Sequence, residues 1–169
     1  WGGKQIIYLP LYIAADTGYF ADHGISAEIY HAGNDDEVFR EVETGRADIG
    51  IGDPSFVAIG AERGVRTQVI AALINNPSLW GVTTHPEIRP MEEAYDFVGL
   101  RFGTYPQPST AYAVLADLRS KFGRSVRSME IIESEIGRQF ELLARGDADV
   151  IFDIEPMISL AEESGMRVV

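Results

Sequence analysis

The 169-residue chain contains no cysteine, so disulfides, thiolate metal sites and cysteine nucleophiles are all excluded. Basic residues are also scarce: 14 Lys and Arg stand against 26 Asp and Glu, which gives a formal net charge of −12 at pH 7. An acidic surface repels phosphate backbones, and we therefore expect no nucleic-acid partner. Long apolar runs are missing too, because no stretch approaches the roughly 20 residues that a membrane-spanning helix needs.

Histidine is rare as well, and the three that occur are scattered at positions 23, 31 and 85. No His-x-x-x-His, Ser-His-Asp or paired-thiol arrangement is found in the sequence. His31 lies near Asp35 and Asp36, which is the one spacing that suggests a set of metal ligands. The scatter of the histidines favours the opposite view, and we expect no catalytic residue, no metal and no cofactor.

What the sequence does contain is an alternation of helical and extended patterns, which predicts an α/β sandwich with a largely parallel sheet. Pro10 suits the first turn of a helix, and Asn34 followed three residues later by Glu37 is typical of a helix cap. Helices are expected at 10–18, 34–45, 53–64, 109–122 and 134–144. Strands are expected at 26–30, 47–51, 67–73, 79–84, 100–104 and 129–132.

Pro86 and Pro90 interrupt this periodicity, which marks residues 86–98 as a hinge or linker between two lobes. The first lobe then spans residues 1–85 and the second spans residues 99–169. A short repeat supports two similar lobes, since Gly-Arg-Ala-Asp-Ile-Gly at 45–50 corresponds to Gly-Asp-Ala-Asp-Val-Ile at 146–151. The alternative is that Gly-x-Ala-Asp is simply a common helix-to-strand turn.

Two motifs carry a resemblance to a known family: LPLYIAADTGYFADHGI at residues 9–25 and GRADIGIGDPS at residues 45–55. Over nearly its whole length the chain resembles the NMT1/THI5-like solute-binding proteins of bacterial ABC importers, the sulfonate, nitrate and thiamin-pyrimidine group. The resemblance implies a two-lobed fold of the type 2 periplasmic-binding-protein class, with a ligand cleft between the lobes. It also implies a small-molecule solute, an ABC transporter membrane permease as partner, and a periplasmic or extracytoplasmic location, with a lipid anchor on a segment outside this sequence as one option.

Full-length members of that family are longer than this chain. The resemblance places a further strand before Trp1 and, after Val169, a long segment that returns to the first lobe. We therefore expect an incomplete first lobe, weak solute binding by these 169 residues, and self-association through an unfinished sheet edge.

Five segments of the sequence lie where strands end or helices begin, which is where open α/β sheets bind their ligands. They are residues 1–8, 33–35, 52–55, 105–110 and 153–156, and the resemblance places ligand contacts in the same five. The candidate ligand-binding residues are Trp1, Tyr8, Asn34, Asp53, Ser55, Tyr105, Ser109, Thr110, Asp153 and Glu155. Several have structural alternatives: Asn34, Asp53, Ser109 and Thr110 as helix caps, Tyr8 as a core residue, and Trp1 as an unconstrained terminus.

Acidic side chains dominate these segments, in which Lys4 is the single basic residue. Carboxylates accept hydrogen bonds from amines, amidines and ring N–H groups, whereas a sulfonate or nitrate site is expected to offer Arg, Lys or many hydroxyls. Aromatic side chains in the same segments can stack on a flat ring or hold a cation. The sequence thus favours a nitrogenous or aromatic, neutral-to-cationic solute. A thiamin-related pyrimidine is one candidate, and an aromatic acid or a flavin precursor is another.

Three functions are compatible with the resemblance. Solute capture for an ABC importer is the leading hypothesis, and the ligand-sensing lobe of a signalling receptor is the second. The third is a pyrimidine-precursor synthase, but the enzymes of this family carry a Lys and a His in the stretch that matches residues 52–57, together with a Cys-rich motif. This chain has Asp53 and Val57 in that stretch and no cysteine, which argues against an enzyme.

Overall fold

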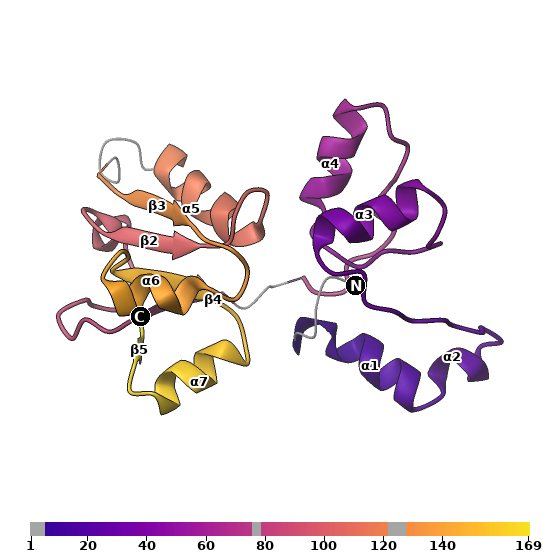
Figure 1. Ribbon diagram of the computed structural model, residues 1–169, viewed down its shortest axis with the longest axis horizontal. Coiled ribbons are helices and arrows are strands. Elements are labelled where there is room, and N and C mark those ends of the chain that lie inside the picture. Colours follow the sequence, from indigo (N-terminus) through magenta and orange to yellow (C-terminus); the bar gives the residue numbers. More distant parts are fainter. Residues whose placement is uncertain (1–5, 76–78, 122–127) are drawn as a thin grey trace. The chain divides into compact units, whose positions relative to one another are not determined.

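The computed structural model describes residues 6–75, 79–121 and 128–169 of the chain. The chain divides into two compact units, unit 1 with residues 1–77 and unit 2 with residues 78–169, and each has its own set of elements (Figure 1). In the part of the chain that is described, no helix combines the length and the apolar character needed to cross a membrane.

Unit 1 is built from short helices joined by irregular segments. Its helices are η1 Ile6–Tyr8, α1 Leu9–Asp16, α2 Tyr19–Asp22, α3 Asp35–Glu43 and α4 Ser55–Glu62. Pro10 occupies the first turn of α1. A backbone N–H in this turn has no acceptor within the helix, so the N–H that proline lacks costs no hydrogen bond. Asn34 caps α3, since its side chain accepts a hydrogen bond of 2.9 Å from the Glu37 backbone N–H. Both predicted helix starts are therefore confirmed.

Glycines allow close contact around α3. Gly60 of α4 lies directly against the Phe39 ring of α3, so a larger residue there would require this ring to shift. The segment after α3 is held as closely, because a Cβ on Gly50 would lie 2.8 Å from Val38 and 2.9 Å from Val42. Both α4 and the segment that follows α3 are thus packed directly against α3.

The strands predicted in the first lobe at 26–30, 47–51 and 67–73 are wrong, since these segments form no strand pairs between described residues. A strand needs a partner whose backbone groups it can hydrogen-bond, and an apolar pattern alone does not supply one. The apolar side chains of these segments are consequently open to solvent: Ile49 is 65% exposed, Val69 60% and Ile70 67%.

Unit 2 contains a five-stranded mixed sheet with the order β3-β2-β4-β1-β5 (Figure 1). The strands are β1 Trp80–Thr83, β2 Arg101–Thr104, β3 Glu130–Glu133, β4 Val150–Asp153 and β5 Arg167–Val168. β2 runs parallel to both β3 and β4, whereas β1 runs antiparallel to β4 and β5. The predicted α/β class is confirmed, but the sheet is mixed rather than largely parallel, because two of the four strand pairings between described residues are antiparallel.

Helices cover both faces of this sheet. They are α5 Thr110–Lys121, α6 Gln139–Arg145 and α7 Met157–Glu163, and the chain also forms the short 3-10 helix η2 Ala94–Phe97. On one face, Phe102 belongs to a buried cluster with Leu115 of α5. On the other face, Ile151 belongs to a second cluster with Leu143 of α6 and Ile158 of α7. The two clusters form the core that holds the sheet between its helices.

The boundary between the two units lies nearer the amino terminus than predicted. It falls between residues 77 and 78, whereas the sequence predicts a linker at 86–98. Residues 79–84, predicted as the last strand of a lobe spanning residues 1–85, contain β1, which pairs with β4 of unit 2. Residues 86–98, predicted as a linker, also belong to unit 2, where Ile88, Met91 and Phe97 pack on the α5 side of the core. Prolines break periodicity without preventing burial, which explains why this segment looks like a linker in sequence.

A bidentate ion pair joins the amino end of β2 to the turn before β4. Arg101 donates from Nε and Nη2 to the two carboxylate oxygens of Asp149, at 3.1 and 2.7 Å, and its backbone N–H adds a third bond of 2.8 Å. The Arg101 guanidinium holds the pKa of the Asp149 carboxyl below its usual range. Because folding lowers this pKa, the pair stabilises the protein above the unfolded-state pKa, and the stabilisation is lost as the pH falls through the folded-state pKa.

We expect Asp149→Asn to lower the free energy of unfolding by about 1.5–3 kcal/mol at neutral pH, the usual contribution of hydrogen bonds to a charged group. The deficit relative to the wild-type protein should shrink as acid titrates the carboxyl. Asp147→Asn is the matched control, because Asp147 is exposed in the same turn, and it should change stability by less than about 0.5 kcal/mol. Urea unfolding across a pH series measures both variants, and equal losses in the two would contradict the role of the ion pair.

Candidate functional site

Residues from several elements meet at the carboxyl edge of the unit 2 sheet. Because β2, β3 and β4 are parallel, their last residues, Thr104, Glu133 and Asp153, lie at the same edge. β1 runs the other way and begins there, so that Trp80 pairs with Asp153. Each of the three parallel strands leads within a few residues into α5, α6 or α7. This is the geometry in which open α/β sheets bind their ligands.

Asp153 is the most buried acidic group of this edge. It is 1% exposed, and its Oδ1 atom accepts hydrogen bonds from the Tyr105 hydroxyl at 2.5 Å and from the Ile154 backbone N–H at 2.8 Å. Burial raises the pKa of the Asp153 carboxyl, and the two hydrogen bonds offset part of that rise. Burial and the neighbouring carboxylate raise the pKa of the Tyr105 hydroxyl, which therefore stays a donor. Since neither donor is charged, the carboxylate can still gain from a cationic or N–H-bearing partner.

Local hydrogen bonds fix the loop that follows β2. Ser109 donates from Oγ to the Tyr105 carbonyl at 3.2 Å and accepts from the Tyr112 backbone N–H at 3.2 Å, which caps α5. The Glu133 carboxylate of β3 accepts from the Gln107 backbone N–H at 2.9 Å and from its side-chain amide at 3.1 Å. The loop that carries Tyr105 and Ser109 is thus held against the carboxyl ends of two strands.

Glu155 and Thr110 lie at helix starts. The Glu155 carboxylate accepts from the backbone N–H of Ser159 at 3.1 Å and from its hydroxyl at 3.0 and 3.1 Å, in the first turn of α7. Ser159 is thus the hydrogen-bond partner that an acidic side chain beside a buried strand requires. No ligand is needed to account for a carboxylate at position 155. Thr110 is the exposed first residue of α5.

Three further residues of this edge are absent from the sequence-based candidates. Thr104 and Ser134 each bury a hydroxyl oxygen that has no hydrogen-bond partner among the described residues, which is a costly arrangement. Thr104 could have been identified from the sequence, because it is a polar residue at the end of a predicted strand. The pairing of Trp80 with Asp153 depends on strand register and has no local signal in the sequence.

In unit 1, the starts of α3 and α4 lie close together. The segment before α4 lies directly against Asp35, since a Cβ on Gly52 would lie 2.9 Å from Asp35 Oδ1. Burial, and then the nearby Asp53 carboxylate, raise the pKa of the Asp35 carboxyl. Asp53 Oδ1 in turn accepts from the Ser55 backbone N–H at 2.8 Å. The structure thus brings Asn34, Asp53 and Ser55 together around Asp35, with cap roles for Asn34 and Asp53.

Two predicted ligand contacts lie near the amino terminus. Tyr8 is 5% exposed and stands directly before α1, which agrees with a core role. Trp1 lies outside the described residues. Ligand binding by the ten candidate residues stays a prediction, and so does the cleft between the lobes.

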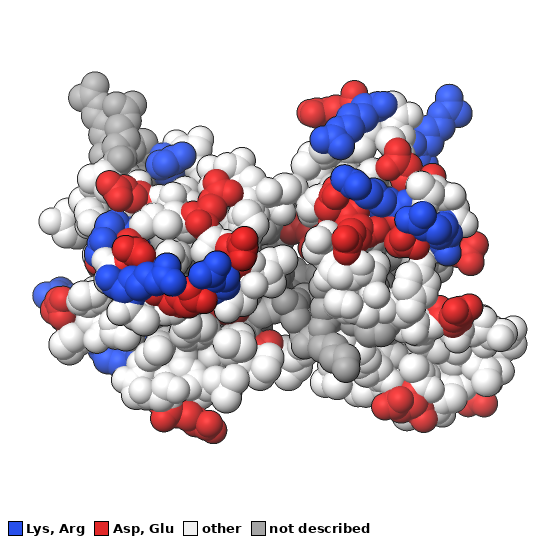
Figure 2. Space-filling view, viewed as in Figure 1, with Lys and Arg blue, Asp and Glu red and all other residues white. Residues whose placement is uncertain are grey.

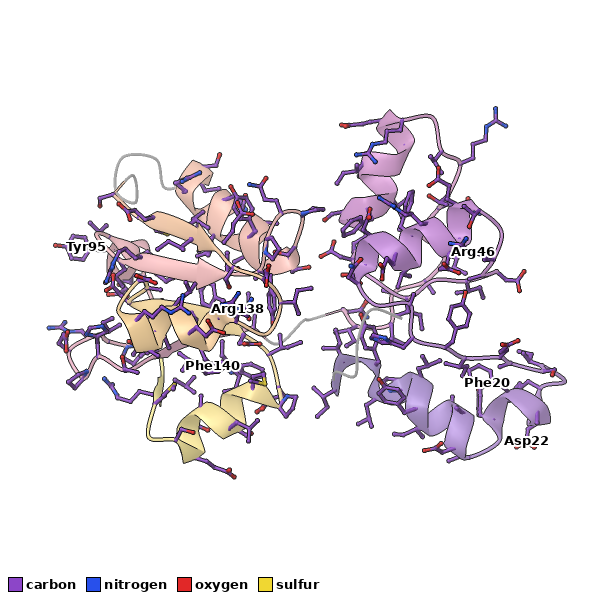
Figure 3. All side chains as sticks on the ribbon, viewed as in Figure 1. Phe20, Asp22, Arg46, Tyr95, Arg138 and Phe140 are labelled. Carbon is purple, nitrogen blue, oxygen red and sulfur yellow. The ribbon has the colours of Figure 1, made fainter. Side chains whose placement is uncertain are left out.

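Several other charged groups form exposed surface pairs. On α6, Glu141 accepts from Arg138 at 2.7 Å and from Arg145 at 2.8 Å, and the side chain of Arg138 is visible in Figure 3. Acidic and basic side chains are interspersed in the same way over the face seen in Figure 2. Exposed pairs of this kind contribute little free energy and do not by themselves mark a functional site. Asp153 differs from them because it is buried and lacks a cationic partner among the described residues.

Known proteins share both the sequence pattern and the fold. A sequence profile of the NMT1/THI5-like family matches residues 5–167. A protein from Bordetella bronchiseptica RB50 superposes with a TM-score of 0.67 at 25% identity, over 99% of this chain and 54% of that one. The alkanesulfonate-binding protein SsuA from Xanthomonas axonopodis pv. citri, solved with MOPS, gives 0.61 at 17% identity, over 94% and 55%.

A third solved structure is the amino acid ABC transporter substrate-binding protein AbpA from Streptococcus pneumoniae, bound to L-arginine. It superposes with a TM-score of 0.54 at 13% identity, over 90% of this chain and 60% of that one. The chain therefore spans a little over half the length of these solved proteins. No curated protein matches it. The likenesses confirm that the fold is that of the type 2 periplasmic binding proteins.

We expect Asp153→Asn to raise the free energy of unfolding at neutral pH by about 1 kcal/mol, since an amide accepts the same two hydrogen bonds without burying a charge. Folding raises the pKa of Asp153, so the wild-type protein loses stability as the pH rises through the titration of this carboxyl, and the variant should not. The sign is opposite to that of Asp149→Asn. Chemical denaturation of both variants across one pH series measures the difference, and a variant destabilised at neutral pH would overturn this view of Asp153.

Proposed function

Because the chain belongs to the NMT1/THI5-like family, we propose that it binds a small solute for delivery to an ABC importer. The membrane permease of that importer is the proposed partner, and the proposed location is periplasmic or otherwise extracytoplasmic. Support comes from the solved proteins with the same fold, which include an alkanesulfonate-binding protein and an amino acid transporter substrate-binding protein. Both solved proteins are named for binding rather than for catalysis, which supports solute binding without chemical conversion as the activity of this chain.

The single observation that carries a solute site is the buried carboxylate of Asp153 at the carboxyl edge of unit 2. A carboxylate at 1% exposure with only neutral donors is electrostatically incomplete, and a solute that brings an N–H group or a positive charge completes it. Trp80, which pairs with Asp153 across the strands, offers an aromatic ring at the same edge. Tyr105 holds the carboxylate in place and offers a second ring.

The charge of the candidate residues supports a solute class. Asp153 in unit 2 and the Asp35–Asp53 pair in unit 1 accept hydrogen bonds or attract cations. We propose a nitrogenous or aromatic solute that is neutral to cationic, with a thiamin-related pyrimidine as the first candidate. A sulfonate such as MOPS brings negative charge toward these carboxylates and is disfavoured by this proposal, although the SsuA structure holds MOPS.

A solute panel tests the proposal. We expect L-arginine or the aminopyrimidine alcohol of thiamin to raise the unfolding temperature in a concentration-dependent way, and MOPS to leave it unchanged. A ligand at one hundred times its Kd adds about 2.7 kcal/mol to the free energy of unfolding, which a thermal-shift assay resolves easily. Stabilisation by MOPS and by neither nitrogenous compound would contradict the proposed solute class.

Variants test the residues against whichever panel compound binds. Asp153→Asn, Asp53→Ala and Glu155→Ala should each weaken binding roughly ten- to a hundredfold, the effect of losing one charged hydrogen-bond partner. Asp147→Asn is the control and should bind like the wild-type protein, because Asp147 is exposed in the turn after α6. Titration calorimetry measures all four. Unchanged affinity and stability in Asp53→Ala or Glu155→Ala would show that those carboxylates are caps alone.

A further inference from the structure

The two oxygens of the buried Asp153 carboxylate are used differently. Oδ1 accepts from the Tyr105 hydroxyl at 2.5 Å and from the Ile154 backbone N–H at 2.8 Å. A carboxylate oxygen has two lone pairs, so these two donors occupy the full accepting capacity of Oδ1. No described residue donates to Oδ2. Oδ2 is therefore the oxygen that is left for a solute, and Oδ1 is not.

One of these two donors is a side chain from another part of the sheet. Tyr105 directly follows β2, whereas Ile154 is the residue next to Asp153 in the chain. The loop that carries Tyr105 is held in place, because Ser109 Oγ donates to the Tyr105 carbonyl at 3.2 Å. Burial and the Asp153 carboxylate raise the pKa of the Tyr105 hydroxyl, so this hydroxyl remains a donor at neutral pH. A single side chain thus decides whether Oδ1 can accept from a solute.

The number of available oxygens matters because cationic groups bind carboxylates in two ways. Amidinium and guanidinium groups are planar forks that donate two parallel N–H bonds, one to each carboxylate oxygen. An ammonium group or a single ring N–H makes a point contact, for which one oxygen is enough. With Oδ1 occupied, a fork loses one of its two bonds at Asp153, whereas a point contact loses none.

We propose that Tyr105 is a specificity-determining residue, which selects a solute with a single N–H or ammonium contact to Asp153 Oδ2 over a solute that binds as a two-point fork. This inference rests on the proposed function and narrows its solute class. Trp80 lies opposite Asp153 on the neighbouring strand, and directly opposite residues of an antiparallel pair share one face of the sheet. A flat ring that carries the amine can therefore pack against Trp80 while the amine contacts Asp153.

Benzylamine and benzamidine are matched probes, because each has a phenyl ring and a positive charge at neutral pH, but the first is a point contact and the second a fork. Titrating each into the ¹⁵N-labelled chain and following the Ile154 amide gives a Kd at the site itself. We expect benzylamine to bind the wild-type chain more tightly than benzamidine does. Tyr105→Phe keeps the ring and frees a lone pair of Oδ1, so the ratio of the two Kd values should shift roughly tenfold or more toward benzamidine. Tyr95→Phe is the matched control, since Tyr95 is 77% exposed on η2 (Figure 3), and it should leave the ratio unchanged.

The ratio of the two Kd values separates this role from a structural one. A loss of stability or a changed titration of Asp153 in Tyr105→Phe affects both cations alike and cancels in the ratio. The same ratio in Tyr105→Phe and the wild-type chain would overturn the role of Tyr105 and leave the proposed solute site standing, and so would a wild-type preference for benzamidine. If neither probe shifts the Ile154 amide in either chain, the proposed solute site at Asp153 is itself overturned, and this inference with it.

Discussion

The pairing of β2 with β4 is the interaction on which the rest of unit 2 depends. The two strands lie in the middle of the sheet, with β3 outside β2 and β1 outside β4. At each end of this pairing, an aspartate in or next to β4 accepts hydrogen bonds from a side chain in or next to β2. Asp149 binds the Arg101 guanidinium at the amino end, and Asp153 accepts from the Tyr105 hydroxyl at the carboxyl end. The loop before α5, which carries the candidates Tyr105 and Ser109, is therefore held at Tyr105 by this pairing.

The two aspartates have opposite electrostatic character. Arg101 lowers the pKa of Asp149, so this carboxylate is charged, paired and stabilising. Burial raises the pKa of Asp153, whose donors are a phenol and a backbone N–H. If stability alone governed the position, an amide would serve better than a buried carboxylate. A buried carboxylate without a cationic partner among the described residues is therefore the reason that we propose a solute site at Asp153.

Local signals in the sequence predict some features of this protein well. The cap at Asn34, the helix after Pro10, and the strands that became β2 and β3 follow from short-range preferences, and the structure has them all. Features that depend on distant partners are predicted poorly. Residues 86–98 look like a linker because of their prolines, but Ile88 and Phe97 are packed on the core. The register that sets Trp80 opposite Asp153 leaves no trace in the local pattern.

The turn that occurs twice in the chain, at residues 45–48 and 146–149, shows which features local sequence determines and which it does not. Gly-x-Ala-Asp produces the same three hydrogen bonds and the same glycine conformation after α3 and after α6, so the turn is determined by its own residues and by the helix before it. Whether the next residues become a strand depends instead on what lies beside them. Val150 is covered by β2 and is buried, whereas Ile49 has no strand beside it among the described residues and is exposed. The motif thus determines the turn, and the neighbouring backbone decides whether the next residues form a strand.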